Sequence, residues 1–374
     1  MTTSRQLFST VSSDGNLTVD VKTVELAEPK ENEVIVKIEL APINPSDLWP
    51  MFSIADLSQA QFTHSEEEIK LSAPLFPGME QVVRTRVDQA CPIGNEASGM
   101  VVATGESDAA KALMGKRVAV LTGSNFAEYA CAPAHMCLPH APSTTAEQAC
   151  SSFVNPLTAL CMVETMRNEG HKALVHTAAA SNLGQMLNRI CIADGVDLVN
   201  IVRKPEQVEI LKSLGAKYVV NSSSDTYMQE LYAAIKETGA TLAFDATGGG
   251  QLANNILTVM EAVLTEGVTG LNTYGALEHK QVYLYGGLDV SPTTLTRGFG
   301  MSWGIGGWLL MRTLGGLEPK RVMELHHRVA TEIGTTFAST YSGEFGFADV
   351  LKPENVALYN AKKTGEKYLF NPNS

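Results

Sequence analysis

The sequence predicts an α/β protein that combines a doubly wound parallel sheet with a second, β-rich domain. Three observations lead to this prediction. From residue 172 to about 285, short apolar runs alternate with segments of helical period, as in parallel strands covered by helices. Before about residue 140, short strands of alternating polarity are separated by many turns. The length of 374 residues also favours two domains over one.

The alternating region opens with a strand, a turn of small residues and a helix. An apolar run at 173–175 leads into the turn, and apolar residues recur at three- and four-residue spacing after it. Small residues let the backbone approach a pyrophosphate, and the helix N-terminus supplies N–H donors. The turn contains one glycine where the dinucleotide-binding pattern has three, so an ordinary strand–helix corner is the alternative. The residues expected to contact a cofactor here are Ala178, Ala179, Ser181, Asn182, Leu183 and Gly184.

The second strand, 198–202, ends at Arg203 and Lys204. An NAD-binding unit has an acidic residue at this distance from the turn, where it binds the ribose 2′-hydroxyl. A guanidinium instead suits a 2′-phosphate, because its planar donors match the phosphate oxygens. The alternative is a solvated basic pair that precedes a helix starting at Pro205. Together with the preceding turn, the basic pair favours NADP.

The alternation then continues to residue 285. Helices are expected at 205–214, 226–238 and 252–263, and strands at 218–220, 241–244 and 282–285. Ligands of such sheets bind at the carboxyl ends of the strands. The further residues expected at the cofactor site are therefore Asn221, Asp245, Thr247, Tyr285 and Gly286. His176, on the first strand, is expected to pack against the sheet rather than to react.

Composition excludes several classes of function. The formal net charge of −12 argues against nucleic acid or an anionic membrane as the main partner. No apolar run reaches eighteen residues, and residues 1–6 lack the apolar core of a signal peptide. The six cysteines form no C-x-x-C pair and no metal-ligand spacing. A reducing, cytoplasmic location is expected.

Six segments, taken in order, resemble the medium-chain dehydrogenase/reductase superfamily, specifically its zinc-independent quinone oxidoreductase and enoyl reductase branch. They are Ile43–Asp47, Gly94-x-Glu96-x-x-Gly99-x-Val101, Gly115–Val118, Asn155–Ala159, the turn at 178–184 and Leu214–Ala216. The resemblance implies a GroES-like domain, a partly open β-barrel, formed by 1–154 and 316–374. It also implies a Rossmann NADP-binding domain at 155–315, an active site between the domains, and a homodimer formed through about 282–310.

The resemblance also implies hydride transfer from NADPH to a quinone or to an α,β-unsaturated carbonyl compound such as an enone or enoyl thioester. Zinc-dependent relatives carry a Cys in the segment that holds Asn44 and a His where this chain has Asn95, and the third ligand position falls near Val154. Catalytic zinc needs three ligands, so no metal is expected. Glu96 is expected to be a structural carboxylate.

Asn44 and Thr158 match the family's active-site Asn and the Thr that lines the nicotinamide, and both could donate hydrogen bonds to a substrate oxygen. The alternatives are that Asn44 holds a turn before Pro45 and that Thr158 caps a helix. Trp49, the third expected catalytic residue, replaces a Tyr of many relatives and cannot donate a proton at ordinary pH. A non-catalytic NADPH-binding protein is therefore the alternative function. The long stretches 50–91 and 265–278 are expected to be lids, binding loops or disorder.

Overall fold

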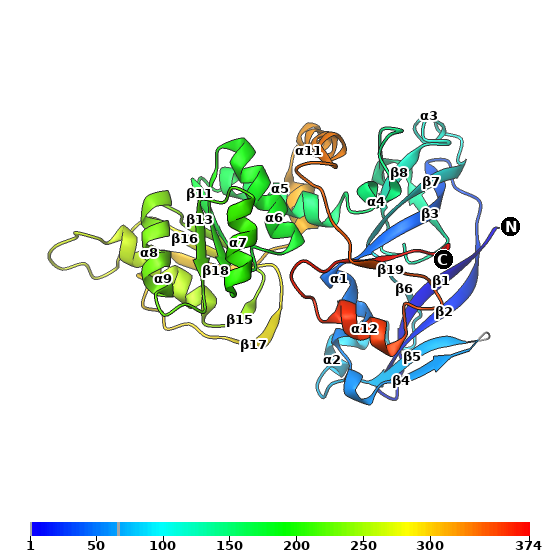
Figure 1. Ribbon diagram of the computed structural model, residues 1–374, viewed down its shortest axis with the longest axis horizontal. Helices are drawn as coiled ribbons and strands as arrows, with labels where there is room; N and C mark the ends of the chain where they lie inside the picture. Colours follow the sequence, from blue (N-terminus) through cyan, green and yellow to red (C-terminus); the bar gives the residue numbers. More distant parts are fainter. Residues whose placement is uncertain (1, 66–67) are drawn as a thin grey trace. The chain divides into compact units, whose positions relative to one another are not determined.

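The computed structural model describes residues 2–65 and 68–374, so Glu66 and Glu67, in an acidic cluster of the long 50–91 stretch, lie outside it. The chain separates into two compact units (Figure 1). The first unit comprises residues up to Val154 and from His326 onward, and the second runs from Asn155 to Leu325. Residues 316–325, expected in the first domain, fall in the second unit. The physical reason is the contact of Arg321 with Glu164, whose Nη2 and Oε1 atoms are 2.8 Å apart.

The first unit is built from two sheets around one apolar core. The five-stranded sheet has the order β4-β5-β2-β1-β6 and is antiparallel throughout. The other has the order β10-β8-β7-β3-β20-β19, with β9 also paired to β3. The strands are β1 (Thr2–Val11), β2 (Asn16–Leu26), β3 (Glu33–Ile43), β4 (Gln61–His64), β5 (Ile69–Pro74), β6 (Cys91–Pro92), β7 (Glu96–Thr104), β8 (Arg117–Leu121), β9 (Tyr129–Pro133), β10 (Cys137–Pro139), β19 (Gly343–Phe345) and β20 (Tyr368–Phe370).

The end of the chain completes the first unit, because β20 pairs antiparallel with β3 and places Tyr368 opposite Ile43. Strand β3 then leads directly into the short helix α1 (Pro45–Leu48) and a π-helical turn, Trp49–Ser53. The C-terminal segment therefore lies beside the chain that carries Asn44 and Trp49. The other helices of this unit are α2 (Glu80–Val83), α3 (Asp108–Lys111), α4 (Ala146–Ala149) and α12 (Pro353–Asn360).

The 50–91 stretch, expected as an irregular insertion, contains the β4–β5 hairpin and α2 in its described part. It also holds the π-helical turn in place. Arg86 donates from Nη1 to Ser9 Oγ at 3.1 Å, and Ser9 Oγ donates to the Pro50 carbonyl at 2.5 Å. These bonds connect the first strand to the residue directly after Trp49.

The second unit contains a six-stranded sheet of order β13-β12-β11-β14-β16-β18 in which every pair is parallel. Figure 1 shows α8 and α9 on one side of this sheet and α5, α6 and α7 on the other. The fold class predicted from the sequence is therefore confirmed. The elements are α5 (Val154–Asn168), β11 (Ala173–His176), α6 (Asn182–Asp194), β12 (Asp197–Val202), α7 (Pro205–Ser213), β13 (Tyr218–Asn221), α8 (Tyr227–Thr238), β14 (Leu242–Asp245), α9 (Leu252–Leu264), β16 (Lys280–Leu284), β18 (Trp303–Gly307) and α10 (Leu310–Gly316). Helix α11 (Pro319–Glu332) begins in this unit and ends in the first.

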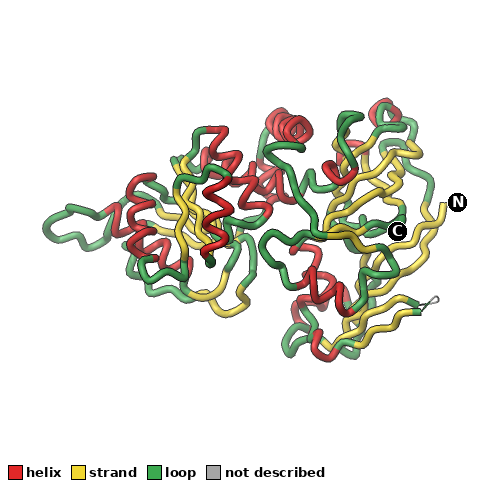
Figure 2. The backbone as a smooth tube through the Cα atoms, in the orientation of Figure 1, coloured by secondary structure: helices red, strands yellow, loops and turns green. Residues whose placement is uncertain are grey.

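Two smaller features follow the ends of β14 and β16. Strand β15 (Gly248–Gly250) pairs in parallel with β17 (Asp289–Thr293), so the loops after two neighbouring strands are joined at the carboxyl edge of the sheet. The 265–279 segment between α9 and β16 forms a loop at the opposite, amino end of β16 (Figure 2). None of the described helices is long and apolar enough to cross a membrane.

Candidate functional site

The turn between β11 and α6 has the tight geometry expected for a phosphate-binding turn. Ser181 precedes the helix and its Oγ accepts a hydrogen bond from the Gly184 N–H at 3.2 Å. Gly184 packs so closely that a Cβ there would lie 2.2 Å from the Ala179 carbonyl oxygen. Ala178 adopts a left-handed φ of 50°, a conformation that normally favours glycine. The one glycine retained from the pattern is thus the one needed for close packing of the helix on the strand.

The Asp245 carboxylate at the end of β14 accepts hydrogen bonds from other groups of the protein. Its Oδ1 accepts hydrogen bonds from Thr177 Oγ1 at 2.7 Å and from the Thr247 N–H at 2.8 Å. Its Oδ2 accepts from the Gly248 N–H at 3.2 Å, and the side chain is fully buried. Asp245 therefore shapes the loop that carries Thr247 and ties it to the end of β11. A carboxylate with both oxygens occupied in this way has a structural role that the sequence did not reveal.

His176 and Tyr285 form a second contact across the strand ends. The His176 Nε2 atom lies 2.7 Å from the Tyr285 hydroxyl, and the two rings are stacked at 5.8 Å. Burial lowers the pKa of His176 to about 3, so the ring is neutral, and burial raises the pKa of Tyr285. Beyond Tyr285, Gly286 packs so closely that a Cβ would lie 2.6 Å from the Ala246 carbonyl oxygen. The predicted residues on β16 therefore shape the same edge as those on β14.

The predicted basic pair lies directly after β12, whose last residue pairs with the end of β13. The Arg203 side chain is exposed, and the backbone N–H groups of Arg203 and Lys204 both donate to Gln207 Oε1, at 3.0 and 3.1 Å. Val202 and Asn221 are paired in the register of the two strands. Arg203, Lys204 and Asn221 thus lie at adjacent strand ends, at the carboxyl edge that also carries the turn after β11.

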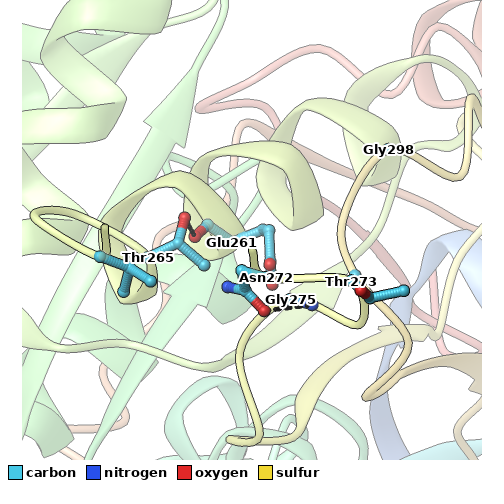
Figure 3. Close-up of a pocket in the computed structure, with 8 residues that line it drawn as sticks. Glu261, Thr265, Asn272, Thr273, Gly275 and Gly298 are labelled. Atoms are coloured by element: carbon cyan, nitrogen blue, oxygen red, sulfur yellow. Dashed lines mark hydrogen bonds between the residues drawn. The ribbon is translucent and has the colours of Figure 1, made fainter. Parts of the chain in front are cut away.

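The pocket in Figure 3 lies elsewhere in this unit. It has a volume of about 410 Å³ and is lined by Glu261 and by residues of the 265–275 and 298–300 segments. Its polar floor is the buried Glu261 carboxylate, whose Oε2 lies 2.7 Å from the Nζ of the fully buried Lys280. Because Lys280 begins β16, this pocket is at the amino edge of the sheet, away from the predicted cofactor residues.

In the first unit, Asn44 is held by two buried carboxylates. Its Nδ2 donates to Glu96 Oε1 at 3.0 Å, and its backbone N–H donates to Asp47 Oδ2 at 2.8 Å. Asp47 Oδ1 also accepts from the Asn95 N–H at 2.8 Å. Asn44 Oδ1 is buried and has no hydrogen-bond partner among the described residues. The sequence motif thus builds a rigid turn, and it leaves the amide oxygen and one amide hydrogen available.

Both oxygens of Glu96 accept hydrogen bonds from the protein. Its Oε2 accepts from the Phe153 and Val154 N–H groups at 2.8 and 3.1 Å, while Oε1 accepts from Asn44. Within residues 2–65 and 68–374, no group of three or more His, Cys, Asp or Glu side chains could hold a metal ion. Glu96 therefore has the structural role that its position in the motif suggested, and it orients Asn44.

Sequence reasoning missed a polar cluster that includes Ser151, two residues before the Phe153 N–H that binds Glu96. Lys367 Nζ donates to Ser151 Oγ at 2.9 Å, and the Tyr341 hydroxyl donates to the same oxygen at 2.8 Å. Cys150 Sγ lies 3.3 Å from the Tyr341 hydroxyl. The sequence signal was slight: Lys367 is a charged residue directly before an apolar strand. Only the pairing of that strand with β3 brings Lys367 close to the Asn44 turn.

The three predicted catalytic residues are divided between the units. Asn44 and Trp49 flank the short helix α1 in the first unit, and Trp49 is 52% exposed at the start of the π-helical turn. Such turns are frequent at functional sites. Thr158 is buried on α5 and belongs to the second unit. The exposed Trp49 ring provides a surface against which a flat ligand could pack.

Comparison with known proteins agrees with this architecture. Residues 30–143 match the model of the alcohol dehydrogenase GroES-like domain, and residues 183–295 match that of the zinc-binding dehydrogenase domain. The chain belongs to the medium-chain dehydrogenase/reductase superfamily. The family resemblance inferred from the sequence motifs is therefore confirmed.

Individual members of the medium-chain superfamily are similar over different lengths. Prostaglandin reductase-3 of Mus musculus is 31% identical over 42% of this chain, and the match covers only 41% of that protein. The mitochondrial enoyl-[acyl-carrier-protein] reductase of Caenorhabditis elegans is 26% identical over 76% of this chain and 73% of its own length. Among solved structures, a putative NADPH:quinone reductase from Mesorhizobium loti is 24% identical and has a TM-score of 0.73. The superposition covers 100% of each of the two chains.

Proposed function

We propose that this protein is an NADPH-dependent oxidoreductase that reduces quinones or α,β-unsaturated carbonyl compounds without zinc. The observation that carries the proposal is the state of Asn44. It lies in the segment where zinc-dependent relatives carry a Cys ligand, and its amide donates to Glu96, whose two oxygens both accept hydrogen bonds from the protein. The named relatives, which include an enoyl reductase and a putative quinone reductase, support the same class of reaction.

The second unit fits a dinucleotide. Gly184 allows the close approach of backbone at the start of α6, and the helix is long enough to present a positive end to a pyrophosphate. Arg203 and Lys204 would hold a 2′-phosphate at the end of β12. A solved complex of Etr1p with NADP and crotonyl-CoA has the same fold, with a TM-score of 0.67 and 19% identity. This similarity is consistent with a nicotinamide cofactor, which supplies a hydride when bound.

The proposed reaction uses few protein groups. A carbonyl-activated alkene or a quinone needs hydride at carbon and hydrogen bonding at oxygen, and we assign the second task to Asn44 and Thr158. Asn44 retains one amide hydrogen because Glu96 accepts the other. The Trp49 indole cannot supply the proton, so water does. An unactivated alcohol would require a base or a metal to remove its proton, so we expect simple alcohols to be poor substrates.

NADPH is expected to bind about ten- to hundredfold more tightly than NADH, because a charge-assisted phosphate contact contributes roughly 1.5–3 kcal/mol. Isothermal titration of both cofactors checks this. Arg203→Ala should remove most of the preference. Lys212→Ala is the matched control, because Lys212 is an exposed cation of the same unit on the far end of α7. Equal affinities of the wild type for the two cofactors would contradict the assignment.

NADPH oxidation with quinones, enones and enoyl thioesters tests the reaction, with NADP reduction by simple alcohols as the opposite case. Asn44→Ala and Thr158→Ala should each lower kcat/KM by roughly tenfold or more, since each removes a hydrogen bond made in the transition state. Activity should persist in a chelator. Turnover of alcohols alone would overturn the proposal, and NADPH binding without turnover of any compound would favour a non-catalytic NADPH-binding protein.

We also propose that the second unit forms a homodimer. Strand β18 is an edge strand, Leu309 shortly after it is 64% exposed, and Val290 on β17 is 94% exposed. An unpaired edge beside exposed apolar surface is a site for pairing with a second copy. Light scattering at micromolar concentration should give twice the chain mass, and a stable monomer would refute this part of the proposal.

A further inference from the structure

The hydrogen bond between His176 and Tyr285, at the carboxyl edge of the parallel sheet, can run in either direction. His176 Nε2 lies 2.7 Å from the Tyr285 hydroxyl oxygen. Burial lowers the pKa of His176 to about 3, so the neutral ring carries one proton, on either Nδ1 or Nε2. With the proton on Nδ1, Tyr285 donates to His176. With the proton on Nε2, His176 donates to Tyr285, and the hydroxyl hydrogen is left for another acceptor.

The other ring nitrogen of His176 decides between these two arrangements. The side chain is completely buried, and its Nδ1 atom has no hydrogen-bond partner among the described residues. A proton on Nδ1 would be a buried donor without an acceptor, and buried N–H groups without a partner are rarer in proteins than acceptors with an unused lone pair. A proton on Nε2 leaves only such a lone pair on Nδ1. His176 therefore donates from Nε2 to the Tyr285 oxygen.

This direction leaves the hydrogen of the Tyr285 hydroxyl without an acceptor in the protein. Tyr285 is partly exposed, and within the described part of the chain its hydroxyl has no partner other than His176. The hydroxyl is nevertheless held in place, because its oxygen accepts from Nε2 and the two rings are stacked with their centres 5.8 Å apart. The Tyr285 hydroxyl is therefore a positioned donor that is available to a ligand.

The strand register shows on which face of the sheet this donor lies. His176 pairs with Phe244, and Phe244 pairs with Tyr283, so these three side chains share one face. Tyr285 follows Tyr283 by two residues and continues the pairing, because its N–H donates to the Asp245 carbonyl at 3.0 Å. The Tyr285 side chain is therefore on the same face as His176.

Helix α5, which carries Thr158, covers this face. The Trp308 ring meets the Phe244 ring edge-on at 5.5 Å, and its Nε1 donates to Thr165 Oγ1 on α5 at 3.1 Å. Thr158 and Thr165 are about two helical turns apart, so they lie on the same side of α5. Because α5 ends shortly before β11 begins, its N-terminal end with Thr158 lies toward the carboxyl edge. Thr158 and Tyr285 are thus at the same edge and on the same face.

We propose that the Tyr285 hydroxyl donates a hydrogen bond to the carboxamide oxygen of the bound nicotinamide, and that His176 is a positioning residue that fixes this donor. The inference rests on the proposed function, because it takes Thr158 to lie beside the nicotinamide. The carboxamide oxygen is the acceptor that the nicotinamide ring offers to a neutral donor. A donor fixed on the sheet sets the orientation of the carboxamide, and with it the orientation of the ring that carries the hydride.

Nuclear magnetic resonance of protein labelled with ¹⁵N-histidine tests the tautomer without cofactor or turnover. The chain has 8 histidines, and the signals of His176 are those that are missing from His176→Phe. Nε2 should carry the proton, and Nδ1 should have the chemical shift of an unprotonated ring nitrogen. A proton on Nδ1 alone would overturn the proposal, because Tyr285 would then donate to His176 and have no hydrogen left for a ligand.

Dissociation constants of NADPH and thio-NADPH, in which sulfur replaces the carboxamide oxygen, test the ligand contact. Sulfur accepts hydrogen bonds weakly, so the wild type should bind NADPH roughly three- to tenfold more tightly, the range for one neutral hydrogen bond. Tyr285→Phe should lose this preference. Tyr283→Phe is the matched control on β16 and should keep it, because the Tyr283 hydroxyl donates to Glu169 Oε1 at 2.7 Å. The ratio of two affinities within one variant does not depend on its stability.

His176→Phe keeps an aromatic ring but removes the donor to Tyr285. The preference for NADPH over thio-NADPH should fall, and it should fall no further in the double variant than in Tyr285→Phe. An unchanged preference in Tyr285→Phe overturns the carboxamide contact, and an unchanged preference in His176→Phe overturns the positioning role. A wild type that binds neither compound contradicts the proposed function itself, so the two failures are distinguishable.

Discussion

Gly184→Ala is expected to destabilise the second unit by about 3 kcal/mol and to abolish measurable NADPH binding. A Cβ at this position would lie 2.2 Å from the carbonyl oxygen and 2.6 Å from the carbonyl carbon of Ala179. Both contacts are with backbone, so no side chain can rotate away, and α6 must move off the end of β11. Urea unfolding and cofactor titration measure the two effects.

Gly315→Ala is the matched control. Gly315 lies in α10 of the same unit, and a Cβ there would meet no atom within 4 Å. Alanine in place of glycine inside a helix should be neutral or slightly stabilising. If Gly184→Ala unfolded at the wild-type urea concentration and still bound NADPH, the close contact would not hold the turn in shape.

Lys280→Met is expected to cost about 3–5 kcal/mol, because it leaves the Glu261 carboxylate buried without its cation. Lys280 is fully buried, its Nζ lies 2.7 Å from Glu261 Oε2, and it also donates to the Glu278 carbonyl at 3.2 Å. Gly275 and Gly300 lie close to the same carboxylate, which also lines the pocket of Figure 3. Urea unfolding measures the loss.

Lys236→Met provides the comparison. Its Nζ lies 2.6 Å from Glu266 Oε1, but both side chains are about half exposed. An exposed pair contributes little, so the loss should be far smaller than that of Lys280→Met. The double change Lys280→Met/Glu261→Gln should recover part of the stability by removing the unpaired charge. Equal losses for the buried and exposed lysines would show that burial does not govern the energetics of these pairs.

The parallel sheet could be predicted because its signals are local. Apolar runs of strand length, helical periods and terminal glycines such as Gly195 and Gly239, which adopt left-handed conformations, are all read within a few residues. The same holds for the turn at 178–184, whose small residues and single glycine are adjacent in sequence. Asn44, Asp47 and Asn95 also appear in short motifs. These motifs are sufficient to indicate the family and the absence of the usual zinc ligands.

The roles of the charged side chains were decided only by the tertiary structure. Asp245 was predicted at the cofactor site, and the structure adds that its oxygens accept hydrogen bonds from Thr177, directly after β11, and from the loop beyond β14. The amide orientation of Asn44 depends on Glu96, 52 residues away in sequence. Lys367 and Lys280 look like ordinary surface lysines in the sequence, because pairing between distant segments leaves no period or motif. Local patterns therefore determined where the strands and helices run, and long-range packing determined which of the charges are buried and what each one holds in place.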